Sequence, residues 1–127
     1  MARIRIALVE DDAAVRIALA RLLRLANYEV CPFASGEEFL AAVGEWMPDC
    51  AVLDVHLPGL SGIQVGLRLR SGHMELPVVF VTASEDPSLD REAFDAGGLR
   101  VLRKPFTSDD LLASIASVLP PPAGSMH

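Results

Sequence analysis

The feature that most limits the fold of this chain is its alternation of short, fully apolar runs with longer amphipathic segments. The runs CAVLD and PVVFVT are continuous and rich in valine, which is typical of strands covered on both faces in a parallel sheet. Five strands are predicted, over Ile4–Val9, Tyr28–Phe33, Cys50–Asp54, Val78–Thr82 and Arg100–Arg103. Parallel neighbours need a crossover between them, and each intervening segment is long enough to supply one.

The segments between these strands predict helices. They lie over residues 13–26, 35–44, 63–70 and 87–96, and from about residue 107 onward. The segment IQVGLRLR from Ile63 alternates and by period alone would be a strand, but a crossover is usually helical, so we predict a helix. The helix over 87–96 has few apolar residues, Leu89, Ala93 and Phe94, and should be loosely held. Together these elements predict a doubly wound (βα)5 domain, flavodoxin-like, with a five-stranded parallel sheet in the order 2-1-3-4-5.

Length and composition narrow the class of protein. The chain has 127 residues, half of them hydrophobic, which suits one domain with a real core. A net charge of −6 argues against nucleic-acid binding by this chain alone. No apolar run reaches the length of a membrane span, and the N-terminus has no signal-peptide pattern. Cys31 and Cys50 form no metal pattern, so buried free thiols are favoured over a disulfide, and we expect a cytoplasmic protein without membrane contact.

Polar side chains stand at the carboxyl ends of four predicted strands. Glu10 and Asp11 follow the first strand, Asp54 ends the third, Thr82 ends the fourth, and Lys104 comes just after the fifth. In doubly wound sheets, ligands bind outside the carboxyl ends of the strands, near the point where the strand order reverses. We therefore expect these side chains to meet at one edge of the sheet. Lys104 is also the single lysine beside ten arginines.

The residue types at this edge predict phosphoryl chemistry. Several neighbouring carboxylates cannot all stay ionised cheaply without a cation. Mg²⁺ takes oxygen ligands and is commonly bound by one or two carboxylates plus phosphate oxygens. Asp54 is the natural nucleophile, because a carboxylate can form an aspartyl phosphate and this one precedes the turn VHLPGLSG. Lys104 and the Thr82 hydroxyl would then contact the oxygens of the phosphoryl group.

Four motifs, LVEDD, LDVHLPGLSG, VTAS and RKPF, occur in this order, each at the end of a predicted strand. Together they resemble the receiver domain of a two-component response regulator, over residues 4–119. The resemblance implies a receiver domain at 1–119, followed by a proline-rich tail or truncated linker at 120–127. It also implies a phosphoacceptor, not a turnover enzyme, that takes its phosphoryl group from a phosphohistidine of a sensor histidine kinase or phosphotransfer protein.

The resemblance further assigns a metal site by position. Asp54 resembles the phospho-acceptor, and Glu10 and Asp11 match the family's acid pair. Asp11 would then be the direct Mg²⁺ ligand and Glu10 a ligand through water. Asp54 and the backbone carbonyl of His56 would complete the shell.

The resemblance also implies a switch. Thr82 matches the switch hydroxyl and Lys104 the phosphate-binding lysine. Val101 stands where the family often has an aromatic ring that swings inward on phosphorylation, so the aromatic half of the switch is expected to differ here. The His56 side chain occupies a variable position that tunes dephosphorylation in the family.

Several alternatives remain open. The acids could be solvated at the rim of an inert flavodoxin-like domain, since acids gather at helix starts. A magnesium-dependent phosphatase with an aspartyl intermediate would usually carry a second acid where this chain has His56. The output could be transcription, through a DNA-binding effector missing from this chain, or partner docking and phosphorelay by a stand-alone receiver. In either case we expect phosphorylation to change an exposed face that binds a partner or a second copy.

Overall fold

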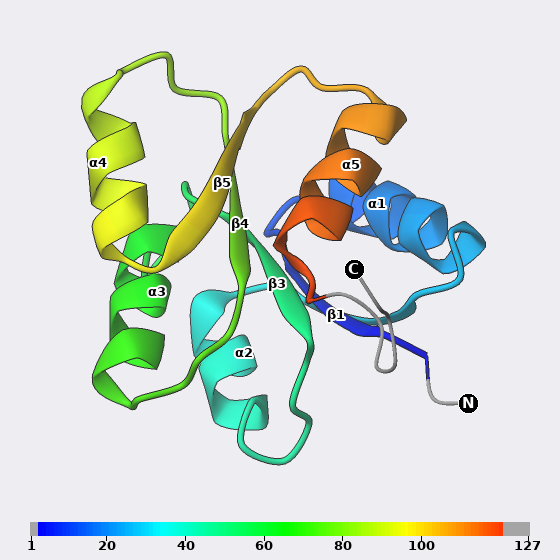
Figure 1. Cartoon of the computed structure of the whole chain (residues 1–127), viewed down its shortest axis with the longest axis horizontal. Coiled ribbons are helices and arrows are strands. Elements are labelled where there is room, and N and C mark those ends of the chain that lie inside the picture. The colour runs from blue at the N-terminus through cyan, green and yellow to red at the C-terminus, as the bar shows by residue number, and fades with distance from the viewer. Residues whose placement is uncertain (1–2, 121–127) are drawn as a thin grey trace.

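A five-stranded parallel sheet lies between two layers of helices in the computed structural model, which describes residues 3–120 (Figure 1). The strands are β1 Arg5–Val9, β2 Glu29–Phe33, β3 Cys50–Asp54, β4 Val78–Thr82 and β5 Gly98–Arg103. The helices are α1 Ala13–Leu25, α2 Gly36–Ala42, α3 Gly62–Ser71, α4 Ser88–Asp95 and α5 Ser108–Val118. All neighbouring strands pair in parallel, in the order β2-β1-β3-β4-β5. The predicted (βα)5 fold is therefore confirmed.

The strands supply two separate hydrophobic cores because successive side chains of a strand point to opposite faces of the sheet. On β3, Ala51 and Leu53 pack in the core beneath α2, α3 and α4. Cys50 and Val52 pack in the core beneath α1 and α5. Figure 1 shows α1 and α5 on one side of the sheet and α2, α3 and α4 on the other. Burial on both faces explains the continuous apolar runs of the sequence.

The segment with strand-like alternation is a helix, as predicted. Ser61 caps α3: its hydroxyl accepts a hydrogen bond from the Gln64 backbone at 3.2 Å. The Gln64 side chain accepts one from the Ser61 backbone at 2.9 Å, which completes a capping box. Val65 and Leu69, four residues apart, are buried on the sheet. Local capping and this helical spacing decide the structure against the alternation.

Strand β5 begins two residues earlier than predicted. The predicted strand started at Arg100, but Gly98 is the first residue of β5. A Cβ atom at Gly98 would lie 2.5 Å from the ring of Phe80. The missing side chain lets the two strands approach around this ring, a use of glycine that the sequence alone does not distinguish from a helix stop.

Helix α4 is held to the sheet by few residues. Leu89 and Ala93 are buried, whereas Phe94, the third apolar residue of this helix, is 68% exposed. The helix begins without a side-chain bond from Pro87; the Asp86 carboxylate instead accepts a hydrogen bond from the Ser88 backbone at 2.9 Å. The short apolar stripe leaves most of the α4 surface in solvent.

Cys31 and Cys50 are free thiols, as predicted. Cys50 is buried, and burial raises the pKa of its thiol to about 12. Cys31 is only partly buried. Within residues 3–120, no helix combines the length and apolar composition that a membrane span needs. The predicted tail over 120–127 lies, beyond Pro120, outside the described residues.

Gly62 lies directly against the turn after β3. A Cβ there would collide with the Asp54 carbonyl oxygen and lie 2.9 Å from the Val55 Cα. We expect Gly62→Ala to lower the free energy of unfolding by about 1–3 kcal/mol, because backbone atoms must shift. Urea denaturation measures this. Gly44→Ala is the control, since nothing lies within 4 Å of its Cβ position; equal stability of the two variants would contradict the expectation.

Candidate functional site

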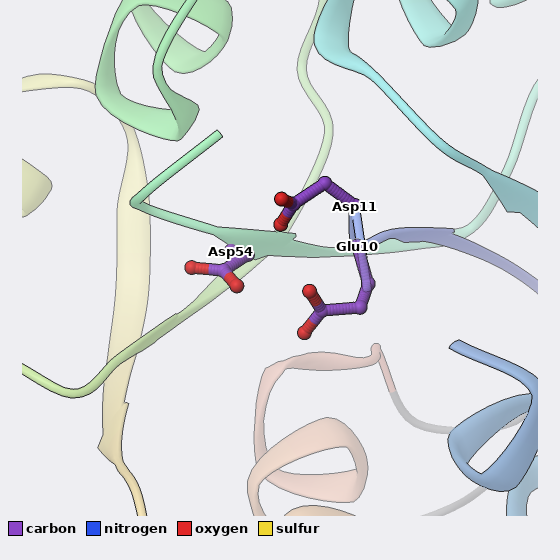
Figure 2. A group of neighbouring side chains, drawn as sticks. All are labelled: Glu10, Asp11 and Asp54. Atoms are coloured by element: carbon purple, nitrogen blue, oxygen red, sulfur yellow. The ribbon is translucent and has the colours of Figure 1, made fainter. Parts of the chain in front are cut away.

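Three predicted acids meet at the carboxyl edge of the sheet. Glu10 and Asp11 follow β1, and Asp54 ends β3. One oxygen atom from each carboxylate lies within 4.8 Å of the others. Figure 2 shows the three side chains together at the ends of these two neighbouring strands. The chain turns from β1 to β2 on one side and continues to β3 on the other, so the cluster sits where the strand order reverses, as predicted.

Glu10 is an almost fully buried acid, 3% exposed. One of its carboxylate oxygens accepts a hydrogen bond from the Asp12 backbone at 3.1 Å, and the other accepts one from the Lys104 amine at 3.2 Å. Burial raises the pKa of Glu10, and the nearby charge of Asp54 adds to that effect. The bonds from Asp12 and Lys104 oppose it without cancelling it. The protein partners of Glu10 therefore only partly compensate the effects of burial and of the Asp54 charge on its carboxylate.

Asp54 is held by two donors in a nearly buried position, 6% exposed. The His56 backbone donates to one carboxylate oxygen at 2.9 Å, and the Lys104 amine donates to the other at 3.1 Å. Burial disfavours the charge on Lys104, but its bonds to and charge pairing with Asp54 and Glu10 outweigh burial, so the pKa of Lys104 is raised. The lysine thus stays protonated between two acids.

Thr82 lies at the same edge but bonds to other groups. Its side chain is fully buried. The hydroxyl accepts a hydrogen bond from the Ser84 backbone at 3.0 Å and lies 3.1 Å from Nε2 of His56. The Thr82 carbonyl accepts a hydrogen bond from the Lys104 backbone at 2.8 Å. The structure therefore links Thr82 to the acid cluster through two residues. The ring of His56 meets Thr82 while its backbone bonds to Asp54. The backbone of Lys104 bonds to Thr82 while its amine bonds to Asp54 and Glu10.

Val101, which stands where the family often has an aromatic ring, lies on β5. It is partly buried and packs against the core beneath α2, α3 and α4. It also lines a shallow cleft between α4 and β5, together with Phe94 and Leu99. A small branched side chain here fills less of this cleft than a ring would.

Arg103 is a residue of this region that sequence reasoning missed. Its guanidinium donates to the carbonyl oxygens of Ser84 at 3.1 Å and Asp86 at 3.2 Å. It also binds both carboxylate oxygens of Asp90, at 3.1 and 3.2 Å. Arg103 thereby ties the end of β5 to the loop after β4 and to α4. The motif RKPF shows an arginine beside the lysine, but its partners come from elements distant in the chain and are visible only in the fold.

Fold and site together define a doubly wound α/β domain with an acidic, lysine-bridged pocket at the carboxyl edge of its sheet. The family model of the response regulator receiver domain matches residues 6–116. Over 116 residues the chain is 39% identical to response regulator MprA of Mycolicibacterium vanbaalenii, covering 91% of this chain and 50% of that protein.

Two solved structures are similar over nearly the whole chain. Chemotaxis protein CheY4 of Vibrio cholerae aligns with a TM-score of 0.88 and 28% identity, covering 93% of this chain and 100% of that one. A putative response regulator from Chloroflexus aurantiacus aligns with a TM-score of 0.86 and 34% identity, covering 92% and 98%.

The chain belongs to the response regulator receiver domain family. A receiver domain is a phosphoacceptor and not a turnover enzyme, and its partner is a histidine kinase. The chain spans about half the length of the curated relatives it matches.

The raised pKa of Glu10 predicts how stability varies with pH. The folded state binds the carboxyl proton of Glu10 more tightly than the unfolded state, in which the pKa of Glu10 is about 4.5. The resulting stabilisation is complete below about pH 4.5 and is lost as the pH rises through the raised pKa. In metal-free buffer, we therefore expect Glu10→Gln to have a higher free energy of unfolding than the wild type at pH values above the raised pKa. Below about pH 4.5 the two proteins should be equally stable.

Urea denaturation at a series of pH values measures this difference. Glu45→Gln, which removes the charge of an exposed acid, is the control and should follow the wild-type pH profile. A Glu10→Gln profile parallel to that of the wild type would contradict the attribution to Glu10.

Proposed function

We propose that Asp54 of this receiver domain accepts a phosphoryl group from a phosphohistidine of a sensor histidine kinase or phosphotransfer protein. The observation that carries the proposal is the Asp54 carboxylate, nearly buried, bonded to the Lys104 amine at 3.1 Å and clustered with two further acids. A solvated rim of acids would not place a buried carboxylate against a lysine. The family membership supports the same role.

The transfer makes one bond and breaks one. A carboxylate oxygen of Asp54 attacks phosphorus while the P–N bond of the phosphohistidine breaks. The bonding electron pair returns to the donor imidazole, which takes a proton from solvent. Lys104, already placed between Asp54 and Glu10, exchanges a carboxylate partner for a phosphoryl oxygen. The Thr82 hydroxyl donates to another phosphoryl oxygen, so charge on the transferred group is neutralised as it develops.

The acid cluster suits a magnesium ion. Its donors are oxygen atoms, which Mg²⁺ prefers, and a divalent cation would offset both the burial of Glu10 and the charge of Asp54, which together raise the pKa of Glu10. Asp11 and Asp54 would hold the ion directly, Glu10 through water, and the backbone carbonyl of His56 would complete the shell. When bound, Mg²⁺ supplies positive charge opposite the phosphoryl oxygens.

Phosphorylation then shifts the population of two conformations. Movement of Thr82 toward the phosphoryl group would displace the loop over residues 83–86, whose carbonyls Arg103 binds. Arg103 would pass the displacement to β5 and α4, and α4 is held by a short apolar stripe. The face that these elements expose would then bind a partner or a second copy. Val101 leaves this switch without its aromatic half.

The output is proposed to be transcription, through an effector domain missing from this chain. The support is that the chain covers about half of the curated response regulators it matches. A stand-alone receiver that acts by docking or phosphorelay is the second candidate, supported by the match to the entire length of CheY4. The acidic net charge argues against nucleic-acid binding by this chain alone. The free cysteines support a reducing, cytoplasmic setting.

Incubation with a small phosphodonor and Mg²⁺, followed by intact mass measurement, tests the acceptor. We expect the wild type to gain one phosphate and Asp54→Asn to gain none, because the amide is not a nucleophile toward phosphorus. Chelation of the metal should slow the gain in the wild type by at least about tenfold. Asp12→Asn is the matched control, since it removes a neighbouring charge and keeps the α1 cap. Stoichiometric phosphate on Asp54→Asn would refute the assignment.

A further inference from the structure

We infer that the His56 side chain is a positioning residue that holds the Thr82 hydroxyl in the unphosphorylated protein, so that the switch must break this bond. The inference rests on the proposed function and adds to it a restraint on the receiver's own switch. It concerns the imidazole ring, whereas the metal role proposed above uses only the His56 backbone.

The hydrogen-bond balance of Thr82 identifies the direction of this bond. A hydroxyl donates one hydrogen and can accept two. The Thr82 oxygen already accepts from the Ser84 backbone at 3.0 Å. Its side chain is fully buried, so the hydroxyl hydrogen also needs an acceptor. Among the hydrogen bonds within residues 3–120, Nε2 of His56, at 3.1 Å, is the group able to accept the hydroxyl hydrogen. We therefore assign the imidazole hydrogen to Nδ1 and the acceptor role to Nε2.

His56 contacts both ends of the switch. Its backbone donates to the Asp54 carboxylate at 2.9 Å, and its ring meets the Thr82 hydroxyl. The residue as a whole is exposed, so the ring can turn into solvent without opening a cavity in either core. One residue of the turn after β3 thus links the acceptor to the switch threonine.

A phosphoryl group on Asp54 competes with His56 for the same hydrogen. Phosphoryl oxygens accept hydrogen bonds, so the Thr82 hydroxyl can donate to one of them only by leaving Nε2. Hydrogen bonds to a charged acceptor are stronger than those to a neutral one, so the exchange favours the phosphorylated conformation. Because the bond to His56 is lost in this exchange, the net free energy that favours the phosphorylated conformation is smaller. His56 thereby sets how completely phosphorylation moves Thr82.

The affinity for beryllofluoride with Mg²⁺, a mimic of the phosphoryl group, measures this restraint. We expect His56→Ala to bind the mimic about three- to tenfold more tightly than the wild type, the range that one neutral hydrogen bond supplies. Water can replace the exposed ring, so the variant should fold. His73→Ala, which removes an exposed histidine of the loop after α3, is the control and should match the wild type.

A double-mutant cycle separates this restraint from a general structural effect. In a Thr82→Val background there is no hydroxyl to release, so His56→Ala should leave the affinity unchanged. An equal effect of His56→Ala in both backgrounds would overturn the inference.

NMR of the imidazole nitrogens gives a readout that does not depend on phosphorylation. In mildly alkaline buffer, the His56 ring of the free wild type should be a single tautomer with Nε2 unprotonated. Thr82→Val, or addition of beryllofluoride with Mg²⁺ to the wild type, should convert it to a mixture of tautomers. A ring that is already mixed in the free wild type, or unchanged by both treatments, would overturn the inference.

Binding of the mimic by the wild type and by His56→Ala distinguishes failure of the proposed function from failure of the His56 role. If the wild type binds no mimic at Asp54, the proposed function fails, and the competition fails with it. If the wild type binds the mimic and His56→Ala binds it equally well, only the role of His56 is refuted.

Discussion

The interaction on which this site depends is the bond of one lysine amine to two buried acids. Glu10 follows β1 and Asp54 ends β3, and their charges repel at a nearly buried edge of the sheet. The Lys104 amine donates to both, at 3.2 and 3.1 Å. A compact ammonium can bridge two carboxylates that a planar guanidinium would bind in a different geometry. This requirement explains why position 104 is a lysine in a chain that otherwise uses arginine.

The same residue joins the charged pocket to the element that we propose to move. The Lys104 backbone bonds to the Thr82 carbonyl, and the neighbouring Arg103 holds the loop that follows. The Thr82 hydroxyl in turn bonds to His56, whose backbone holds Asp54. A change of charge on Asp54 therefore acts at once on two of the partners of Thr82, His56 and Lys104. Such a closed set of contacts suits a two-state switch better than a graded one.

The sequence predicted the strands and their convergence because both depend on simple patterns. Valine-rich runs indicate strands buried on both faces, and the rule for parallel sheets brings their ends together. The bond of His56 to Thr82 and the contacts of Arg103 were missed because they depend on side-chain geometry across elements distant in the chain. The start of β5 at Gly98 was missed because a glycine that admits the Phe80 ring resembles a helix stop.

The most direct test of the central claim is a crystal structure of the protein with Mg²⁺ and beryllofluoride. The account predicts beryllium on an Asp54 oxygen, with the ion about 2.1 Å from oxygens of Asp54 and Asp11. The Lys104 amine and the Thr82 hydroxyl should each contact a fluorine. A Lys104 amine turned away from Asp54, or an ion bound away from these carboxylates, would contradict it.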